Sequence, residues 1–128
     1  AIPIKESYQK AACGHCKASL LDTKPISVDT SSFDRLMLND ERLIIADFWA
    51  PWCGPCRSMA PSFEEAARHF PLKAQFIKIN TEEQQHLGGR FGIRSIPTVI
   101  AFKNNRIVDQ FSGALPASQI IAFVKKHL

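Results

Sequence analysis

Four cysteines lie in two pairs, and in each pair two residues separate the cysteines: Cys13 with Cys16, and Cys53 with Cys56. Two thiols at this spacing can form a disulfide with one another or share a metal ion, so the pattern indicates redox chemistry or metal binding. A thiolate is the attacking species in disulfide exchange and is also the form that binds metals. The residues around each pair must therefore decide which chemistry it supports.

The second pair lies in the segment Trp52-Cys53-Gly54-Pro55-Cys56, between an apolar run and a stretch with helical periodicity. We expect Cys53 at the N-terminus of the helix, where free backbone N–H groups and the helix dipole favour a thiolate. Pro55 suits the first turn of a helix, and Cys56 follows one turn later, within reach of a mixed disulfide on Cys53. These features favour a redox pair. The alternatives are a buried cysteine pair without a function and half of a metal site.

The hydrophobic pattern predicts the elements that must position these cysteines. Alternating or continuous apolar runs predict strands, and apolar residues at i, i+3 and i+4 predict helices. A cap at Thr30, Ser31 or Ser32 is expected to begin the first helix. Asn104 and Asn105 are expected to form a hairpin turn. The resulting order is β-α-β-α-β-α-β-β-α, with strands over 26–28, 43–49, 74–80, 98–102 and 107–111 and the later helices over 55–70, 82–91 and 118–127.

Such an order predicts an α/β fold with a central mixed sheet and helices on both of its faces. The chain has 128 residues, of which 45% are hydrophobic and 22% charged, as in an ordinary globular protein. We interpret residues 1–25 as a short N-terminal extension and residues 26–128 as a single domain.

Charge and hydropathy exclude other classes of function. Apolar runs fall far short of the ~20 residues that a membrane span needs. The net charge is +4, and the positive side chains are scattered without interleaved aromatic residues, so nucleic-acid binding is not expected. The first residues show no signal-peptide pattern, and a cytoplasmic location is therefore expected.

Two segments of the chain resemble the thioredoxin family. Residues 47–56 read DFWAPWCGPC, which is similar to the active-site segment of the family, and residues 92–98 read GIRSIPT, which is similar to a second family motif. The resemblance covers about residues 26–128 and implies a thioredoxin fold. Within the family the chain resembles the thioredoxin 2 branch, whose members carry an N-terminal extension with two Cys-x-x-Cys pairs that bind zinc.

The resemblance also implies roles for residues around the second cysteine pair. Cys53 would be the attacking thiol and Cys56 the resolving thiol, while Asp47 would be a buried carboxylate that exchanges a proton with Cys56. We expect the pKa of Asp47 to be raised, because an apolar strand disfavours a charged carboxylate. Lys78 would support this proton transfer. The alternative for Asp47 is a structural ion pair with Lys78, and Trp49 is expected to pack beneath the site.

A substrate groove is implied beside these residues. Ile96 would precede a cis proline, Pro97, and its backbone would pair with an extended substrate, as in strand addition. An ordinary trans turn before a strand is the alternative. Trp52, Gly113 and Ala114 would complete the groove, where the missing side chain of Gly113 would let a peptide backbone approach.

The function that the resemblance implies is reduction of protein disulfides by dithiol exchange. The substrates would be proteins that contain disulfides, no cofactor would be required, and an NADPH-dependent thioredoxin reductase would restore the dithiol. Two alternatives stay open at this stage. One is a binding or adaptor module on the same fold without redox turnover, and the other is a disulfide oxidant or isomerase.

The first pair, Cys13-Gly14-His15-Cys16, has a different context from the second. No strand precedes it and no tryptophan flanks it, so a zinc site is better supported than a second redox site. Zinc needs four ligands, and the usual ribbon places about 15–20 residues between its two pairs. An upstream pair at that distance would fall before Ala1. We therefore expect a zinc half-site, with a disulfide, zinc shared between two chains and free thiols as alternatives.

Overall fold

The computed structural model describes residues 24–128. Their elements follow the order predicted from the hydrophobic pattern. The strands are β2 (Ile26–Ser27), β3 (Leu43–Trp49), β4 (Ala74–Asn80), β5 (Thr98–Lys103) and β6 (Arg106–Ser112), and the helices are α3 (Thr30–Asn39), α4 (Gly54–Arg68), α5 (Gln85–Arg90) and α6 (Ala117–Lys125).

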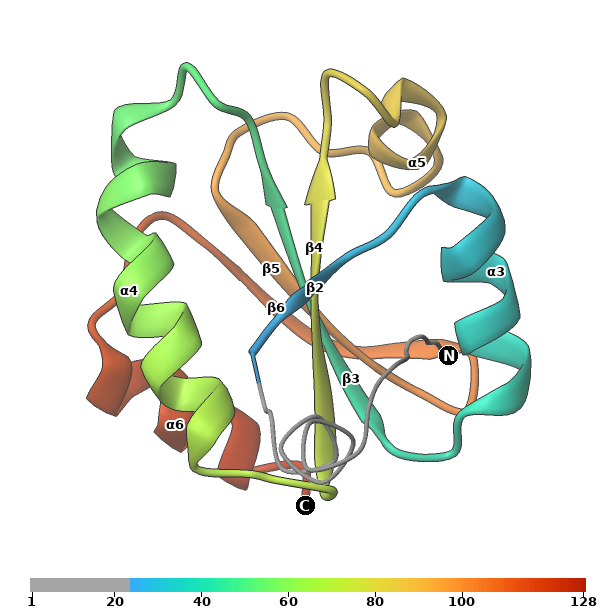
Figure 1. Cartoon of the computed structure of the whole chain (residues 1–128), viewed down its shortest axis with the longest axis vertical. Helices are drawn as coiled ribbons and strands as arrows, with labels where there is room; N and C mark the ends of the chain where they lie inside the picture. The colour runs from blue at the N-terminus through green and yellow to red at the C-terminus, as the bar shows by residue number, and fades with distance from the viewer. Residues whose placement is uncertain (1–23) are drawn as a thin grey trace, which may run out of the picture.

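The strands form a mixed five-stranded sheet in the order β2-β4-β3-β5-β6. Strands β2 and β3 run parallel to β4, whereas β5 runs antiparallel to both β3 and β6. Helices α4 and α6 cover one face, and α3 and α5 cover the other (Figure 1). The predicted fold class is therefore confirmed. Central strand β3 is buried on both faces, which explains its almost continuous apolar sequence.

The two faces of the sheet carry separate cores. Under α4 and α6, Phe63 and Phe70 pack around Phe76 of β4 in a cluster that also includes side chains of β3, β5 and α6. Under α3 and α5, the core contains side chains from these two helices and from β3, β4 and β5. Four aromatic rings there meet edge to face, from Phe33, Phe48, Phe91 and Phe102.

The cap of α3 differs from the prediction. The N-cap is Asp29, and its carboxylate accepts a hydrogen bond of 2.7 Å from the backbone N–H of Ser32. The three residues expected as caps, Thr30, Ser31 and Ser32, instead form the first helical turn. An aspartate caps at least as well as a serine or threonine, so the helix begins one residue after Asp29.

Other boundaries shift by one to three residues. Helix α5 begins at Gln85 instead of residue 82, because the side chain of Asn80 accepts the backbone N–H groups of Glu82 and Glu83 and holds them in a turn. Helix α4 begins one residue early and ends two residues early, and α6 covers 117–125 instead of 118–127. Both hairpin strands are longer than predicted.

The hairpin turn confirms the expectation for the asparagine pair. Asn104 and Asn105 have φ angles of 53° and 63°, the left-handed conformation that a tight hairpin turn requires. No helix within residues 24–128 is long and apolar enough to cross a membrane. Cys13 and Cys16, on which the zinc prediction rests, lie outside the described residues.

Candidate active site

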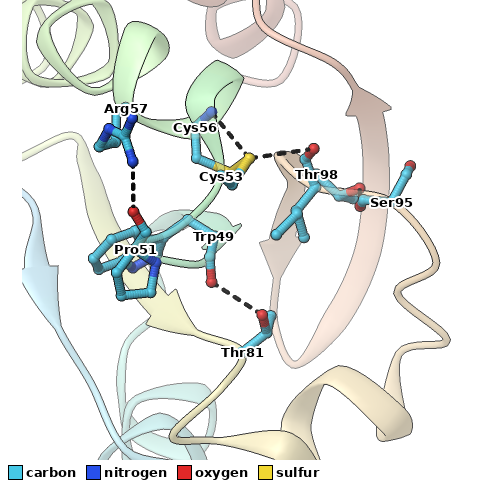
Figure 2. Close-up of a disulfide and its surroundings, with 9 residues drawn as sticks. Trp49, Pro51, Cys53, Cys56, Arg57, Thr81, Ser95 and Thr98 are labelled. Carbon is cyan, nitrogen blue, oxygen red and sulfur yellow. Dashed lines mark hydrogen bonds between the residues drawn. A yellow bond between two sulfur atoms is a disulfide. The ribbon is translucent and has the colours of Figure 1, made fainter.

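The second cysteine pair lies where β3 passes into α4. Cys53 and Cys56 are joined by a disulfide, and their Cα atoms are 5.2 Å apart. Cys53 is the N-cap of α4 and Pro55 lies in the first turn of the helix, as the spacing predicted. Figure 2 shows the disulfide between the start of α4 and the segment that carries Ser95 and Thr98.

The two sulfur atoms have different surroundings. The backbone N–H of Cys56 donates a hydrogen bond of 3.2 Å to Sγ of Cys53. The Cys53 sulfur also lies 3.7 Å from the carbonyl oxygen of Ile96. A donor N–H at a helix N-terminus stabilises negative charge on the capping atom. When the disulfide is reduced, the site therefore favours a thiolate on Cys53.

The segment opposite the disulfide contains the predicted cis proline. The Ile96–Pro97 bond is cis, so the trans-turn alternative is wrong. The hydroxyl of Thr98 donates a hydrogen bond of 2.6 Å to the carbonyl of Ser95. The backbone N–H of Gly113 donates to the carbonyl of Pro97 at 2.9 Å. These two bonds hold the segment at both ends and bring Gly113 beside it.

Gly113 has a φ angle of 94°, in the region that favours glycine, and a Cβ built on it would meet no atom within 4 Å. A side chain there would be strained by the backbone angle and not by crowding. Space for an approaching chain is therefore open above Gly113, and Ala114 beside it is exposed.

Asp47 lies in the middle of β3 and has no exposed surface. Neither oxygen of its carboxylate has a hydrogen-bond partner among residues 24–128. Burial raises the pKa of Asp47 to about 7, and the positive charge of Lys78 acts in the opposite direction. The expectation of a raised pKa is confirmed. A carboxyl group with this pKa can both accept and release a proton near neutral pH.

Lys78 is the register partner of Asp47 on β4. Its Nζ atom lies over the ring of Trp49, 4.5 Å from the ring centroid. Trp49 packs against the cluster of Ala50, Cys53 and Cys56, as expected for a residue beneath the site. The indole N–H of Trp49 is buried and has no hydrogen-bond partner among the described residues.

A groove of about 430 Å³ lies beside the disulfide and brings Trp52 and Ile96 together. Trp52 is 65% exposed and forms one wall. The groove's lining does not include Gly113 or Ala114, which approach the site from the β6 side. Its other lining residues are Thr81, Gln85, Gly88, Gly89, Gly92, Ile93, Arg94 and Ser95.

Two supporting residues were missed by the sequence reasoning. The backbone N–H and the hydroxyl of Thr81 donate to the carbonyl of Trp49 at 2.8 and 3.0 Å. The guanidinium of Arg57 donates to the carbonyl of Pro51 at 2.8 Å (Figure 2). They hold the two ends of the loop before Cys53. No motif marks Thr81, and the only sequence signal for Arg57 is its place directly after Cys56.

The site can carry two electrons without a bound group. Reducing the Cys53–Cys56 disulfide to two thiols takes up two electrons and two protons, so dithiol exchange needs no cofactor. Within residues 24–128, no group of three or more His, Cys, Asp and Glu side chains is placed to hold a metal ion.

Comparison with known proteins gives one consistent family. The family model described as thioredoxin matches residues 24–126. Thioredoxin of Haemophilus influenzae is 38% identical over 103 residues, which are 80% of this chain and 96% of that protein. Thioredoxin 1 of a Nostoc species is 41% identical over 101 residues, which are 79% of this chain and 94% of that protein.

Other relatives extend the comparison beyond bacteria. An M-type chloroplast thioredoxin of pea is 43% identical over 101 residues, which are 79% of this chain and 59% of that protein. The crystal structure of Malassezia sympodialis thioredoxin superimposes with a TM-score of 0.74 and 30% identity, covering 82% of this chain and 91% of that one. The chain belongs to the thioredoxin family and is a thiol–disulfide oxidoreductase that reduces disulfide bonds in proteins.

Proposed function

We propose that Cys53 is the attacking thiol of this reductase and Cys56 the resolving thiol. The observation that carries this assignment is the difference between the two sulfur atoms. The Cys53 sulfur caps α4 and accepts the Cys56 N–H, which lowers the free energy of a thiolate at that position. Gly54 and Pro55, between the two cysteines, belong to the first turn of α4.

The exchange takes place in two steps. The Cys53 thiolate attacks one sulfur of the substrate disulfide, a mixed disulfide forms, and the other substrate sulfur leaves as a thiolate. The Cys56 thiol then loses its proton and attacks the Cys53 sulfur. The second substrate thiolate leaves, and the pair ends as the Cys53–Cys56 disulfide, so two electrons have passed to the substrate.

Asp47 is the group that we propose takes the proton from Cys56. Its raised pKa supports this role, because a carboxylate with a pKa of about 7 is a better base than an exposed aspartate. Neither oxygen accepts a hydrogen bond from any residue of the described part of the chain, so both can bind a proton. Lys78 supports the transfer through its positive charge, which offsets part of the cost of an ionised carboxylate.

Substrate binding is assigned to the surface around the Cys53 sulfur. The Ile96 backbone beside Pro97 would pair with an extended stretch of the substrate. Trp52 supplies an exposed aromatic wall on one side, and Gly113 with Ala114 supplies an open backbone on the other. A disulfide in a locally unfolded or extended segment is the class of substrate that fits this arrangement.

Reduction of insulin by dithiothreitol, followed as turbidity, tests the roles of the two cysteines. Cys53→Ser is expected to reduce the catalysed rate to the level without protein. Reduced Cys56→Ser, freed of dithiothreitol and mixed with insulin, is expected to accumulate a mixed disulfide between Cys53 and the substrate, visible by mass spectrometry. Arg68→Gln, at the far end of α4, is the control and should retain the full rate. A mixed disulfide trapped on Cys56 in the Cys53→Ser variant would reverse the assignment.

An NADPH-dependent thioredoxin reductase is the proposed electron donor in the cell, and the reducing cytoplasm is the proposed location. The reaction leaves the pair oxidised after each turnover and so requires a two-electron donor, and membership of the thioredoxin family supports a reductase of this kind in that role. Oxidation of NADPH by a purified reductase in the presence of the chain and insulin tests it. Cell fractionation tests the location, since the similar proteins include a chloroplast thioredoxin as well as bacterial ones.

The extension at residues 1–25 is proposed to belong to a zinc-ribbon thioredoxin, with Cys13 and Cys16 as half of the metal site. The spacing of the two cysteines supports this proposal. Metal analysis of the purified chain should find less than one zinc per chain, and this zinc should disappear in a Cys13→Ser/Cys16→Ser variant. Zinc that persists in that variant, or a Cys13–Cys16 disulfide in the native chain, would contradict it.

A further inference from the structure

The register of the sheet gives Lys78 two neighbours on β3. Alternate residues of a strand face the same side, so Asp47 and Trp49 share the face that α4 covers. Lys78 is paired with Asp47, and Trp49 lies on the diagonal two residues further along β3. The Lys78 ammonium therefore has a carboxylate directly opposite and an indole ring on the diagonal.

The indole is the neighbour that the ammonium contacts. The 4.5 Å between Nζ and the centroid of the Trp49 ring is within the range of a cation–π interaction. Neither oxygen of Asp47 is hydrogen-bonded to Lys78. Lys78 is only half-buried, so its side chain has a route to solvent, where the ammonium would be hydrated and the side chain would regain rotamer entropy.

We propose that Trp49 is a positioning residue, whose indole face keeps the Lys78 ammonium beside Asp47 in both charge states of the carboxylate. The inference rests on the proposed proton transfer, in which Asp47 is protonated and ionised in turn. A lysine held by charge alone would lose its attraction each time Asp47 took up a proton. The attraction of the indole face does not depend on that proton, so Lys78 is in place when Asp47 ionises again.

Among the described residues, Lys78 of β4 is the charged group that acts on Asp47, and the partner residue on β5 is the apolar Val99. Cys53 and Cys56, at the start of α4, pack against Trp49 and do not titrate while they form a disulfide. Removing the indole also admits water near Asp47, which changes the pKa of Asp47 without any involvement of Lys78. The contribution of Lys78 must therefore be measured with and without the indole.

A double-mutant cycle on the pKa of Asp47 makes this measurement. The pKa is followed by carboxyl ¹³C NMR in the oxidised full chain, where neither active-site cysteine titrates. Lys78→Met is expected to raise the pKa of Asp47 by about 1 unit when Trp49 is present, because a nearby positive charge is lost. In the Trp49→Leu background the same change should give at most about a third of that shift, because the ammonium has already moved to solvent.

Trp49→Phe tests whether the ring face itself is responsible. Phenylalanine attracts a cation less strongly than tryptophan, so the shift caused by Lys78→Met should fall in the order Trp, Phe, Leu at position 49. If Trp49→Leu does not fold, the comparison is made between the native chain and Trp49→Phe. Equal pKa shifts from Lys78→Met in these two backgrounds would overturn the proposal. Lys103→Met removes an exposed lysine at the end of β5 and should leave the pKa of Asp47 unchanged.

Equal shifts from Lys78→Met in all backgrounds would show that Trp49 does not position the lysine. A larger shift without the indole would show that the ring holds the ammonium away from Asp47, and would also overturn the proposal. A separate experiment tests the proposed proton transfer by Asp47. If the Asp47→Asn variant reduces disulfides at the native rate from pH 6 to 9, Asp47 does not take part in that transfer. The double-mutant cycle is independent of this result, because it measures a pKa and requires no turnover.

Discussion

The two faces of the sheet differ in whether they bury ionisable side chains. The core beneath α3 and α5 consists of apolar side chains, and four phenylalanine rings meet there edge to face. The face beneath α4 and α6 contains a similar apolar cluster, but it also buries Asp47, whose carboxylate has no hydrogen-bond partner within residues 24–128. The residue paired with Asp47 is the half-buried Lys78.

Because of this difference, we expect one face to contribute mainly to the stability of the fold and the other to contain the reactive groups. An unpartnered buried carboxylate costs free energy, and that cost is tolerated because other contacts hold the fold. The apolar face can supply that stability, because its cluster of described residues contains no titratable side chain and no cysteine. We expect substitutions on the apolar face to change the free energy of unfolding with little effect on the rate, and substitutions at Asp47 to change both.

Truncation of the aromatic core should have the largest effect on stability. Phe33→Ala removes a ring that meets Phe91 and Phe102 and is 1% exposed, so the free energy of unfolding should fall by about 3–5 kcal/mol. The rate of insulin reduction per folded molecule should stay within about twofold of the native rate. Urea unfolding and the turbidity assay measure the two quantities.

Leu38→Ala is the matched control for Phe33→Ala, because Leu38 lies on the same helix and is 75% exposed. Its effect on the free energy of unfolding should be within about 0.5 kcal/mol. A comparable loss of stability in both variants would contradict the assignment of the core. A large loss of rate in folded Phe33→Ala protein would show that the two faces are not separable.

Asp47→Asn should stabilise the protein above neutral pH. The folded pKa of about 7 is higher than the ordinary value of 3.8, so the folded state holds a proton that the unfolded chain has released between these values. The free energy of unfolding of the native protein therefore falls as pH rises from about 4 to about 7, by a total of about 4 kcal/mol. The substituted asparagine carries no charge, so the variant escapes this loss.

Urea unfolding of oxidised protein from pH 4 to pH 8 tests this prediction. The difference between Asp47→Asn and the native chain should be small at pH 4 and should grow to about 4 kcal/mol at pH 8. Asp34→Asn, which removes a partly exposed carboxylate paired with Arg90, is the control and should show no such growth. Parallel pH profiles for Asp47→Asn and the native chain would mean that Asp47 is not buried as a neutral acid.

Asp29→Ala should have the smallest of the three effects. It removes the cap of α3 on the apolar face, and we expect the free energy of unfolding at pH 7 to fall by about 1 kcal/mol without a change in rate. Ser31→Ala is the comparison, because Ser31 is one of the caps predicted from sequence. If Ser31→Ala costs as much stability as Asp29→Ala, the cap is not where the structure places it.

Much of the fold and part of the site follow from local patterns. The alternation of strands and helices depends on the spacing of apolar residues within 5–15 positions, and the nine predicted elements all occur. The disulfide pair lies at a helix N-terminus because Cys53, Pro55 and Cys56 are within one turn of each other. The raised pKa of Asp47 was predictable, because an acid inside an apolar strand is buried wherever that strand packs.

Tertiary structure decided the contacts between distant parts of the chain. The Ile96 carbonyl lies against the Cys53 sulfur across 43 positions, and Thr81 reaches the Trp49 carbonyl across 32. The position of Lys78 over the Trp49 ring follows from the register of β3 and β4. Spacing along the chain reports only which residues share a turn or a strand face. Which carbonyl faces a sulfur, and which side chain an ammonium contacts, depends on how the strands are aligned.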